Sequence, residues 1–168
     1  YLPDHERIVA ALARLELAIE RDRLDEAHYH GVAALEEFRD GDRSIWHAYH
    51  RAYARVCGVP ADDVDTAMAV LLEEFERGGV WTRVIPGSRA ALQELVTLGF
   101  RVAVVSNADG TVEAQLRHDA ICQVGPGAGA AVELILDSAV VGVSKPDPAI
   151  FALALDALGV EPTDAVHV

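Results

Sequence analysis

The segment ELILDSAVVGVSKPDPAIFALALDALG, residues 133–159, predicts a strand, a proline-stiffened loop and a helix in succession. The strand is expected over Glu133–Asp137, which is a short apolar run that ends in a carboxylate. The helix is expected over Pro148–Leu158, with Asp147 as its N-cap and Gly159 as its end. A strand that leads through a short connection into a helix is the repeating unit of a parallel α/β sheet.

The sequence before this segment continues the same alternation. Residues 101–106, RVAVVS, predict a buried parallel strand, and residues 111–118 predict the helix that follows it. Pro86-Gly87-Ser88 is expected to open an earlier helix, and Ala165–Val168 predicts a third strand. The predicted fold class is therefore α/β, with a parallel sheet whose ligands bind at the carboxyl ends of the strands.

Residues 1–79 have a different pattern, which predicts helices only. Apolar residues recur at helical spacing, for example at Ile8, Leu12 and Leu15. Gly41-Asp42 is expected to break the helices, and Asp62 or Asp63 is expected to cap the last of them. We expect a small antiparallel helical bundle.

Composition excludes several classes of protein. The 168 residues carry 27 acidic and 14 basic side chains, a formal charge of −13, which argues against a nucleic-acid partner. Glu133 and Asp137 interrupt the most apolar stretch, so no membrane span is predicted. Cys57 and Cys122 are too few for a disulfide framework or a zinc site, which fits a cytoplasmic location. We expect both cysteines to be small buried residues.

Three residues lie at the ends of the predicted strands or in the loops after them, and they are the candidates for chemistry. Ser106 and Asn107 end the first strand, where a hydroxyl and an amide can donate hydrogen bonds to an anionic oxygen, although both are also ordinary turn residues. Lys145 lies in the later loop, Ser144-Lys145-Pro146-Asp147-Pro148, which two prolines stiffen, and it can neutralise a phosphate or carboxylate charge. It is the only lysine among the basic residues, of which the others are arginine. In a chain whose other basic residues are all arginine, a single lysine is better explained by a position that requires a compact ammonium than by chance at the surface.

These residues lie in segments that resemble the haloacid dehalogenase superfamily, most of whose members are magnesium-dependent phosphatases. The resemblance is carried by Pro86-Gly87, by Val105-Ser106-Asn107 and, most specifically, by DSAVVGVSKPDPAIF at residues 137–151. Residues 1–79 resemble the helical cap domain that this family inserts after its first strand. The resemblance therefore implies a helical cap over residues 1–80 and part of a Rossmann-like core over residues 81–168.

The resemblance also implies a mechanism and a substrate class. An aspartate attacks the phosphorus of a small phosphorylated metabolite, and water hydrolyses the aspartyl-phosphate. Ser106 and Asn107 would bind the phosphoryl oxygens, and Ser106 and Lys145 would be catalytic. Magnesium would bridge the phosphate and carboxylates that belong to the first and last family motifs.

The first and last motifs are not found within residues 1–168. No Asp-x-Asp-x-Thr precedes the helical segment, and the acidic metal motif would begin directly after Val168. We therefore expect the chain to be part of a longer protein, to contain no metal ligand of its own and to be inactive alone. Residues 107–112, NADGTV, mimic the nucleophile motif with Asn107 in place of the attacking aspartate, but an amide is a poor nucleophile.

Two other functions remain open at this point. A 2-haloacid dehalogenase, in which the aspartate attacks carbon without magnesium, shares the Ser-Asn and Lys-Pro-Asp-Pro segments. A non-catalytic binding or regulatory protein would have kept the fold and lost the nucleophile. The sequence leaves the oligomeric state open.

Other polar and aromatic groups are expected to serve the structure. Gly125–Gly129 lacks the Gly-Lys-Ser/Thr of a phosphate loop and predicts a flexible connection. We expect a core position in the helical bundle for three aromatic residues, and solvated or partly buried positions rather than a metal site for four histidines. The aromatic residues are Trp46, Tyr49 and Tyr53, and the histidines are His28, His30, His47 and His50.

Overall fold

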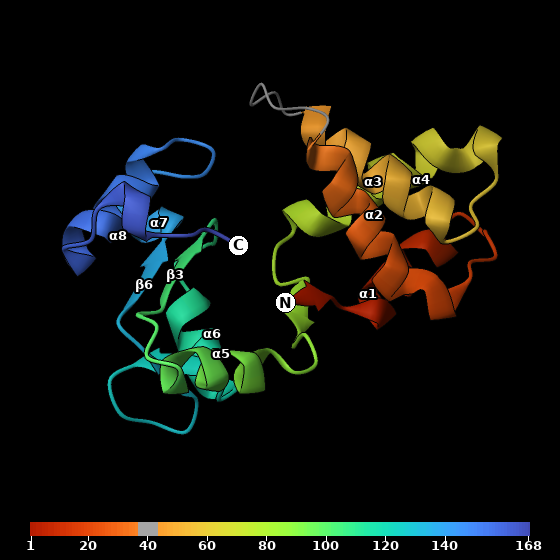
Figure 1. Cartoon of the computed structure of the whole chain (residues 1–168). Helices are drawn as coiled ribbons and strands as arrows, with labels where there is room; N and C mark the ends of the chain where they lie inside the picture. The colour runs from red at the N-terminus through yellow and green to blue at the C-terminus, as the bar shows by residue number, and fades with distance from the viewer. Residues whose placement is uncertain (37–43) are drawn as a thin grey trace. The chain divides into compact units, whose positions relative to one another are not determined.

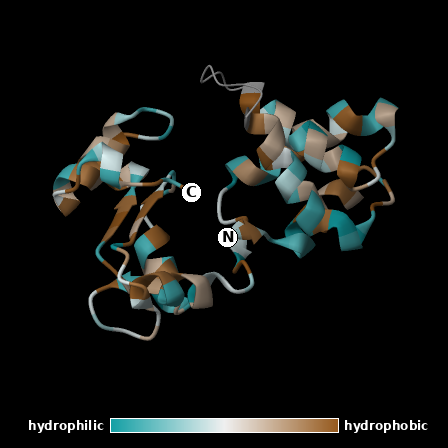
Figure 2. Ribbon diagram, viewed as in Figure 1, coloured by the Kyte–Doolittle hydropathy of each residue, from teal (hydrophilic) through white to brown (hydrophobic). Residues whose placement is uncertain are grey.

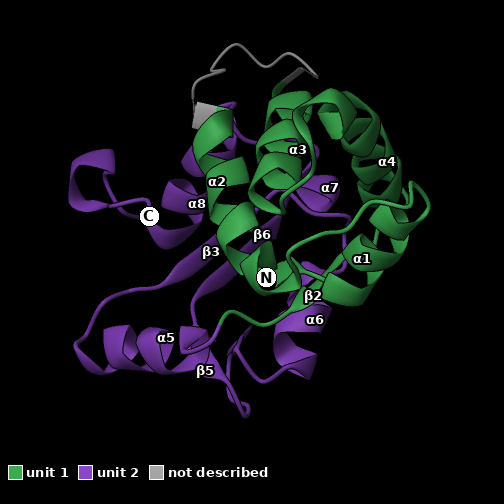
Figure 3. Cartoon of the chain, turned by 90° about the vertical axis from the view of Figure 1, so that its right-hand side faces the viewer, with its two compact units in different colours: residues 1–85 green, residues 86–168 purple. Residues whose placement is uncertain are grey.

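A computed structural model describes residues 1–36 and 44–168 of the chain (Figure 1). The chain divides into two compact units, Tyr1–Ile85 and Pro86–Val168, which are coloured separately in Figure 3. The first unit is mainly helical, and the second alternates strands with helices. The helix break expected at Gly41-Asp42 lies outside the described residues.

The first unit is a group of packed helices with one short strand pair, β1 with β2, that the sequence did not predict. These strands pair antiparallel across nearly 80 residues of sequence and are too short to show an alternating pattern. Asp63 stands at the N-cap of α4, as predicted, but its side chain makes no capping hydrogen bond. The elements are β1 (Leu2–Pro3), α1 (His5–Ala13), a 3₁₀ turn (Arg21–Arg23), α2 (Leu24–Glu36), α3 (Ser44–Val56), a 3₁₀ turn (Ala61–Asp63), α4 (Val64–Glu76) and β2 (Trp81–Arg83).

The core of this unit is built from the facing sides of α1, α2, α3 and α4, and brown ribbon segments mark the apolar residues in Figure 2. Tyr49 and Tyr53 of α3 are fully buried, as predicted, whereas Trp46 is 40% exposed. Gly31 of α2 faces the ring of Tyr49, and a Cβ at this position would lie 2.6 Å from the ring carbon Cδ2. A glycine at this point therefore lets α2 and α3 approach closely. Cys57 is also fully buried, as predicted.

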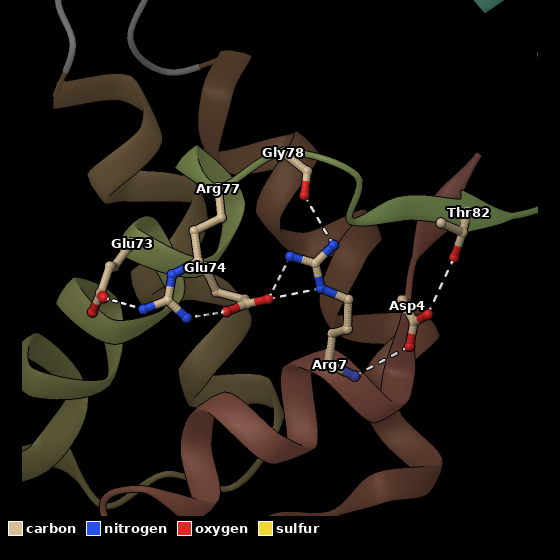
Figure 4. Close-up of polar contacts among 7 residues, drawn as sticks. All are labelled: Asp4, Arg7, Glu73, Glu74, Arg77, Gly78 and Thr82. Carbon is tan, nitrogen blue, oxygen red and sulfur yellow. Dashed lines mark hydrogen bonds and ion pairs between the residues drawn. The ribbon is translucent and has the colours of Figure 1, made fainter. Parts of the chain in front are cut away.

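A chain of charged groups joins α1 to α4 at the edge of the core (Figure 4). The Nε of Arg7 donates to Oε1 of Glu74 over 2.7 Å, and its NH1 donates to the carbonyl oxygen of Gly78 over 2.9 Å. Arg77 donates to the other carboxylate oxygen of Glu74 over 3.0 Å. Glu74 is only 8% exposed, so both of its oxygens depend on these two arginines for the hydrogen bonds that water would otherwise make.

Replacing Glu74 with alanine is expected to lower the free energy of unfolding by about 3 kcal/mol, because the guanidinium of Arg7 then loses its partly buried partner. Urea denaturation followed by circular dichroism measures this loss. Glu73 is the matched control, since it pairs with Arg14 and Arg77 at the exposed surface. Glu73→Ala is expected to lower the free energy of unfolding much less than Glu74→Ala. Equal losses in the two variants would contradict the stabilising role assigned to the buried Glu74.

The second unit has the parallel strands of an α/β fold, as predicted. Strands β3 and β6 pair in parallel, and their register aligns Ala103 with Leu134 and Ser106 with Asp137. Strands β4 and β5 form a second parallel pair. The elements are α5 (Ser88–Thr97), β3 (Ala103–Ser106), α6 (Val112–His118), β4 (Cys122–Val124), β5 (Ala130–Val132), β6 (Leu134–Asp137), α7 (Ser138–Val141), α8 (Ala149–Leu158) and a 3₁₀ turn (Pro162–Asp164).

The structure corrects four details of this unit. Strands β4 and β5 flank the glycine-rich segment 125–129, for which the sequence predicted only a flexible connection, and neither strand was predicted. Strand β3 is half-buried rather than buried. Ala165–Val168 is not a strand, because it pairs with no other described segment. Pro148 stands at the N-cap of α8, and Asp147 supports this end by accepting from the backbone N–H of Ala149.

Within the described residues, no helix combines the length and the apolar character needed to cross a membrane.

Candidate functional site

The candidate residues gather at the carboxyl ends of β3 and β6 in the second unit. Ser106 is the last residue of β3 and Asp137 is the last residue of β6, and the parallel register places them side by side. Ligands of parallel α/β sheets bind at this edge, where the loops after neighbouring strands converge. The loop after β3 carries Asn107, and the loop before α8 carries Lys145.

The side chain of Asp137 holds the loop that follows β3 through hydrogen bonds. Its Oδ2 accepts from the backbone N–H of Gly110 over 2.9 Å and from that of Val112 over 3.4 Å. Its Oδ1 accepts from the N–H of Ala139, the first turn of α7, over 3.0 Å. The carboxylate is 5% exposed, so backbone donors replace the water that would otherwise solvate it.

Ser138 adds a second tie to the same loop. Its hydroxyl accepts from the backbone N–H of Ala108 over 3.1 Å and lies 3.4 Å from the carbonyl oxygen of Ala108. From the sequence, Asp137 was placed at the end of a strand and Ser138 within a family motif, and neither was given a functional role. The signal available was a carboxylate at the end of an apolar strand, but its partners lie about 25 residues earlier in the sequence.

Lys145 reaches back to β3. Its Nζ donates to the carbonyl oxygen of Val105 over 3.0 Å, which brings the ammonium beside Ser106. The side chain is half-buried, and this burial lowers the pKa of Lys145 below its ordinary value. No described carboxylate forms an ion pair with it. The ammonium is therefore a partly desolvated positive charge that an anion at this edge would stabilise.

Asn107 joins the loop after β3 to the loop that carries Lys145. Its Oδ1 accepts from the backbone N–H of Lys145 over 2.8 Å, and its Nδ2 donates to the carbonyl oxygen of Lys145 over 2.9 Å. Both ends of the carboxamide thus contact the backbone of one residue. The structure brings Ser106, Asn107 and Lys145 together, as their sequence positions at the strand ends suggested.

The hydroxyl of Ser106 differs from the neighbouring polar side chains in its hydrogen bonding. Among the described residues, none forms a hydrogen bond with its Oγ, whereas the side chains of Asn107 and Ser138 are both bonded to the protein. Ser106 is half-buried in the last position of β3. It is therefore able to donate its proton to an oxygen of a bound anion.

The carboxylates near this edge do not form a magnesium site by themselves. Within residues 1–36 and 44–168, no three acidic, histidine or cysteine side chains gather closely enough to hold a metal ion. The oxygens of Asp137 accept from backbone N–H groups, and Oδ1 of Asp109 accepts from the backbone N–H and the hydroxyl of Thr111. Asp109 thus stabilises its own turn. The described carboxylates at this edge therefore do not fit the magnesium ion that the family resemblance implies.

Two of the histidines pack into the helical unit. Nδ1 of His28 lies 3.0 Å from the hydroxyl of Tyr49, and Nδ1 of His50 lies 2.6 Å from the carbonyl oxygen of Trp46. His50 is fully buried, and this burial lowers its pKa to about 4, so its imidazole is neutral at pH 7.

Comparisons with known proteins identify a matching family and several relatives of this chain. A family model described as haloacid dehalogenase-like hydrolase matches residues 2–168. The haloacid dehalogenase-like hydrolase domain-containing protein 3 of Xenopus laevis is 32% identical over 68% of this chain and 44% of its own length. The protein of the same name from Mus musculus is 36% identical over 68% of this chain and 43% of its own length.

The chain therefore spans less than half of the length of these curated relatives. A solved dehalogenase structure described as having an intermediate complex aligns with 96% of this chain and 68% of its own, with a TM-score of 0.43 and 19% identity. Because the family model covers almost every residue, the chain belongs to the haloacid dehalogenase-like hydrolase family.

Proposed function

We propose that this chain is part of a magnesium-dependent phosphatase that acts on a small phosphate ester. The observation that carries the proposal is the half-buried ammonium of Lys145, held 3.0 Å from the carbonyl oxygen of Val105 and beside Ser106 at the carboxyl edge of the sheet. A preorganised positive charge and a hydroxyl donor are the two groups that a transferring phosphoryl group requires from this edge.

In this proposal Ser106 and Lys145 bind and stabilise the same anion. Ser106 donates a hydrogen bond to one phosphoryl oxygen, and Lys145 offsets the negative charge of the phosphoryl group and of the attacking carboxylate. The nucleophilic aspartate and the magnesium ligands are assigned by the family resemblance to segments outside residues 1–168. At this edge of the sheet, Asp137 accepts from backbone N–H groups, and Asp109 accepts from the backbone N–H and the hydroxyl of Thr111.

We further propose that the protein works in the cytoplasm and needs no nucleic-acid or membrane partner. The support is the net charge of −13 and the two cysteines, which are buried and not joined in a disulfide.

A 2-haloacid dehalogenase is the second candidate. A single ammonium and a hydroxyl donor suit the carboxylate of a haloacid as well as a phosphate, and Lys145 supplies one positive charge rather than two. The attacking aspartate would then displace a halide from carbon, and no metal would be needed. A non-catalytic binding protein with the same fold is the third candidate.

Assays of the full-length protein distinguish these candidates. We expect phosphate release from p-nitrophenyl phosphate that requires added magnesium and stops with a chelator. Chloride release from 2-chloropropionate without magnesium would overturn the phosphatase proposal in favour of the dehalogenase. If correctly folded protein showed neither activity, the result would favour the non-catalytic binding protein.

A further inference from the structure

The carboxamide of Asn107 matches the backbone of Lys145 group for group. The oxygen of the side chain accepts from the N–H of Lys145 over 2.8 Å, and the nitrogen donates to the C=O of Lys145 over 2.9 Å. An asparagine offers both an acceptor and a donor at one side-chain end, whereas aspartate offers acceptors only. The residue type at position 107 is thus the one that completes both bonds.

The two bonds fix the residue whose side chain supplies the positive charge. They hold the backbone of Lys145 to the first residue after β3, and the side chain then returns to β3, where its Nζ donates to Val105. Lys145 is therefore held at both ends, by Asn107 at the backbone and by Val105 at the ammonium. The loop around Lys145 is largely exposed. Within it, the backbone N–H of Asp147 donates to the carbonyl oxygen of Ser144.

We propose that Asn107 is a positioning residue that sets the location of the Lys145 ammonium, and that it does not act mainly by binding the substrate. The functional meaning of that location rests on the proposed phosphatase activity. A displacement of a catalytic group by about 1 Å is enough to reduce the rate by about 10²-fold. Such a displacement is the expected result of losing both backbone bonds.

The acidic groups around the loop do not supply an alternative restraint. Asp109 accepts from Thr111, Asp137 accepts from Gly110 and Ala139, and Asp147 accepts from Ala149. None of these carboxylates pairs with Lys145 in the described part of the chain. The burial that lowers the pKa of Lys145 therefore depends on where the loop holds its side chain.

The first test measures Lys145 directly and needs no turnover. In the full-length protein, acetylation of the Lys145 peptide is followed by mass spectrometry as a function of pH, and the midpoint gives the pKa of this amine. In Asn107→Ala we expect the midpoint to rise toward the ordinary value for lysine, about 10.4, because the released side chain is better solvated. Ser144→Ala is the matched control, since its exposed side chain makes none of these contacts, and it is expected to keep the wild-type midpoint.

The second test separates positioning from substrate binding. With p-nitrophenyl phosphate, Asn107→Ala is expected to lower kcat by about 10²-fold with little change in KM. Asn107→Asp keeps one acceptor but faces the carbonyl of Lys145 with a second oxygen, so we expect it not to restore kcat.

An unchanged labelling midpoint in Asn107→Ala, together with a raised KM, would overturn the positioning role and favour direct binding of substrate. A shifted midpoint in a protein that hydrolyses no phosphate ester would support the positioning role and reject the phosphatase proposal separately.

Discussion

Replacing Lys145 with alanine is expected to lower the kcat of the full-length protein on p-nitrophenyl phosphate by about 10³-fold. The half-buried ammonium is the positive charge that this chain places beside Ser106, and alanine leaves the developing negative charge without it. Because the ammonium acts on charge that grows in the transition state, the loss is expected in kcat more than in KM. Steady-state kinetics at saturating magnesium measure both quantities.

Lys145→Arg is the informative companion to this change. A guanidinium keeps the charge, but it is larger and planar, and it does not fit a position where one compact Nζ donates to the carbonyl of Val105. We expect it to recover only a small part of the lost rate. Circular dichroism of Lys145→Ala should match the wild type, since Lys145 lies in the loop between α7 and α8 and its side chain is only half-buried. Wild-type turnover in Lys145→Ala would refute its catalytic role.

Replacing Asp137 with alanine is expected to lower the free energy of unfolding by about 3 kcal/mol. The change leaves the backbone N–H groups of Gly110, Val112 and Ala139 without their acceptor at a position that is 95% buried from solvent. The loop after β3 then loses its main tie to β6, so kcat is expected to fall as well. Urea denaturation and the same phosphatase assay measure the two effects.

Two controls make the Asp137 result specific. Asp137→Asn keeps one acceptor oxygen and is expected to lose less stability than alanine. Asp109→Ala removes a carboxylate from the same loop, but one that is exposed and bonds only within its own turn, so its loss is expected to be much smaller. If Asp109→Ala destabilised the protein as much as Asp137→Ala, the assigned role of Asp137 would be wrong.

The parts of the fold that could be predicted are those with a local signal. The β-branched run that ends in Ser106 and the apolar run that ends in Asp137 each predict a strand, and both form and pair in parallel. The rule that parallel strands bind ligands at their carboxyl ends then located Ser106 and Lys145 at one edge. The capping prediction for Asp63 was less accurate, because a side chain can occupy the cap position without bonding the helix.

The parts that could not be predicted depend on contacts between distant residues. Leu2–Pro3 and Trp81–Arg83 pair as strands only because the helices between them bring both segments together. Asp137 and Gly110 are similarly far apart in sequence, and so are Asn107 and Lys145. A single sequence shows which residue types are present at these positions, but it does not show which carboxylate or amide bonds to which backbone group.

The most direct test of the proposed phosphate site is the protection of Lys145 by a bound anion. The full-length protein is acetylated with magnesium in the presence of orthovanadate, which resembles the transferring phosphoryl group, and the extent of labelling at Lys145 is compared with that in chloride of equal ionic strength. We predict that orthovanadate protects Lys145 over the same concentration range in which it inhibits hydrolysis of p-nitrophenyl phosphate. Unchanged labelling of Lys145 at concentrations that fully inhibit the enzyme would contradict a phosphate site at this edge of the sheet.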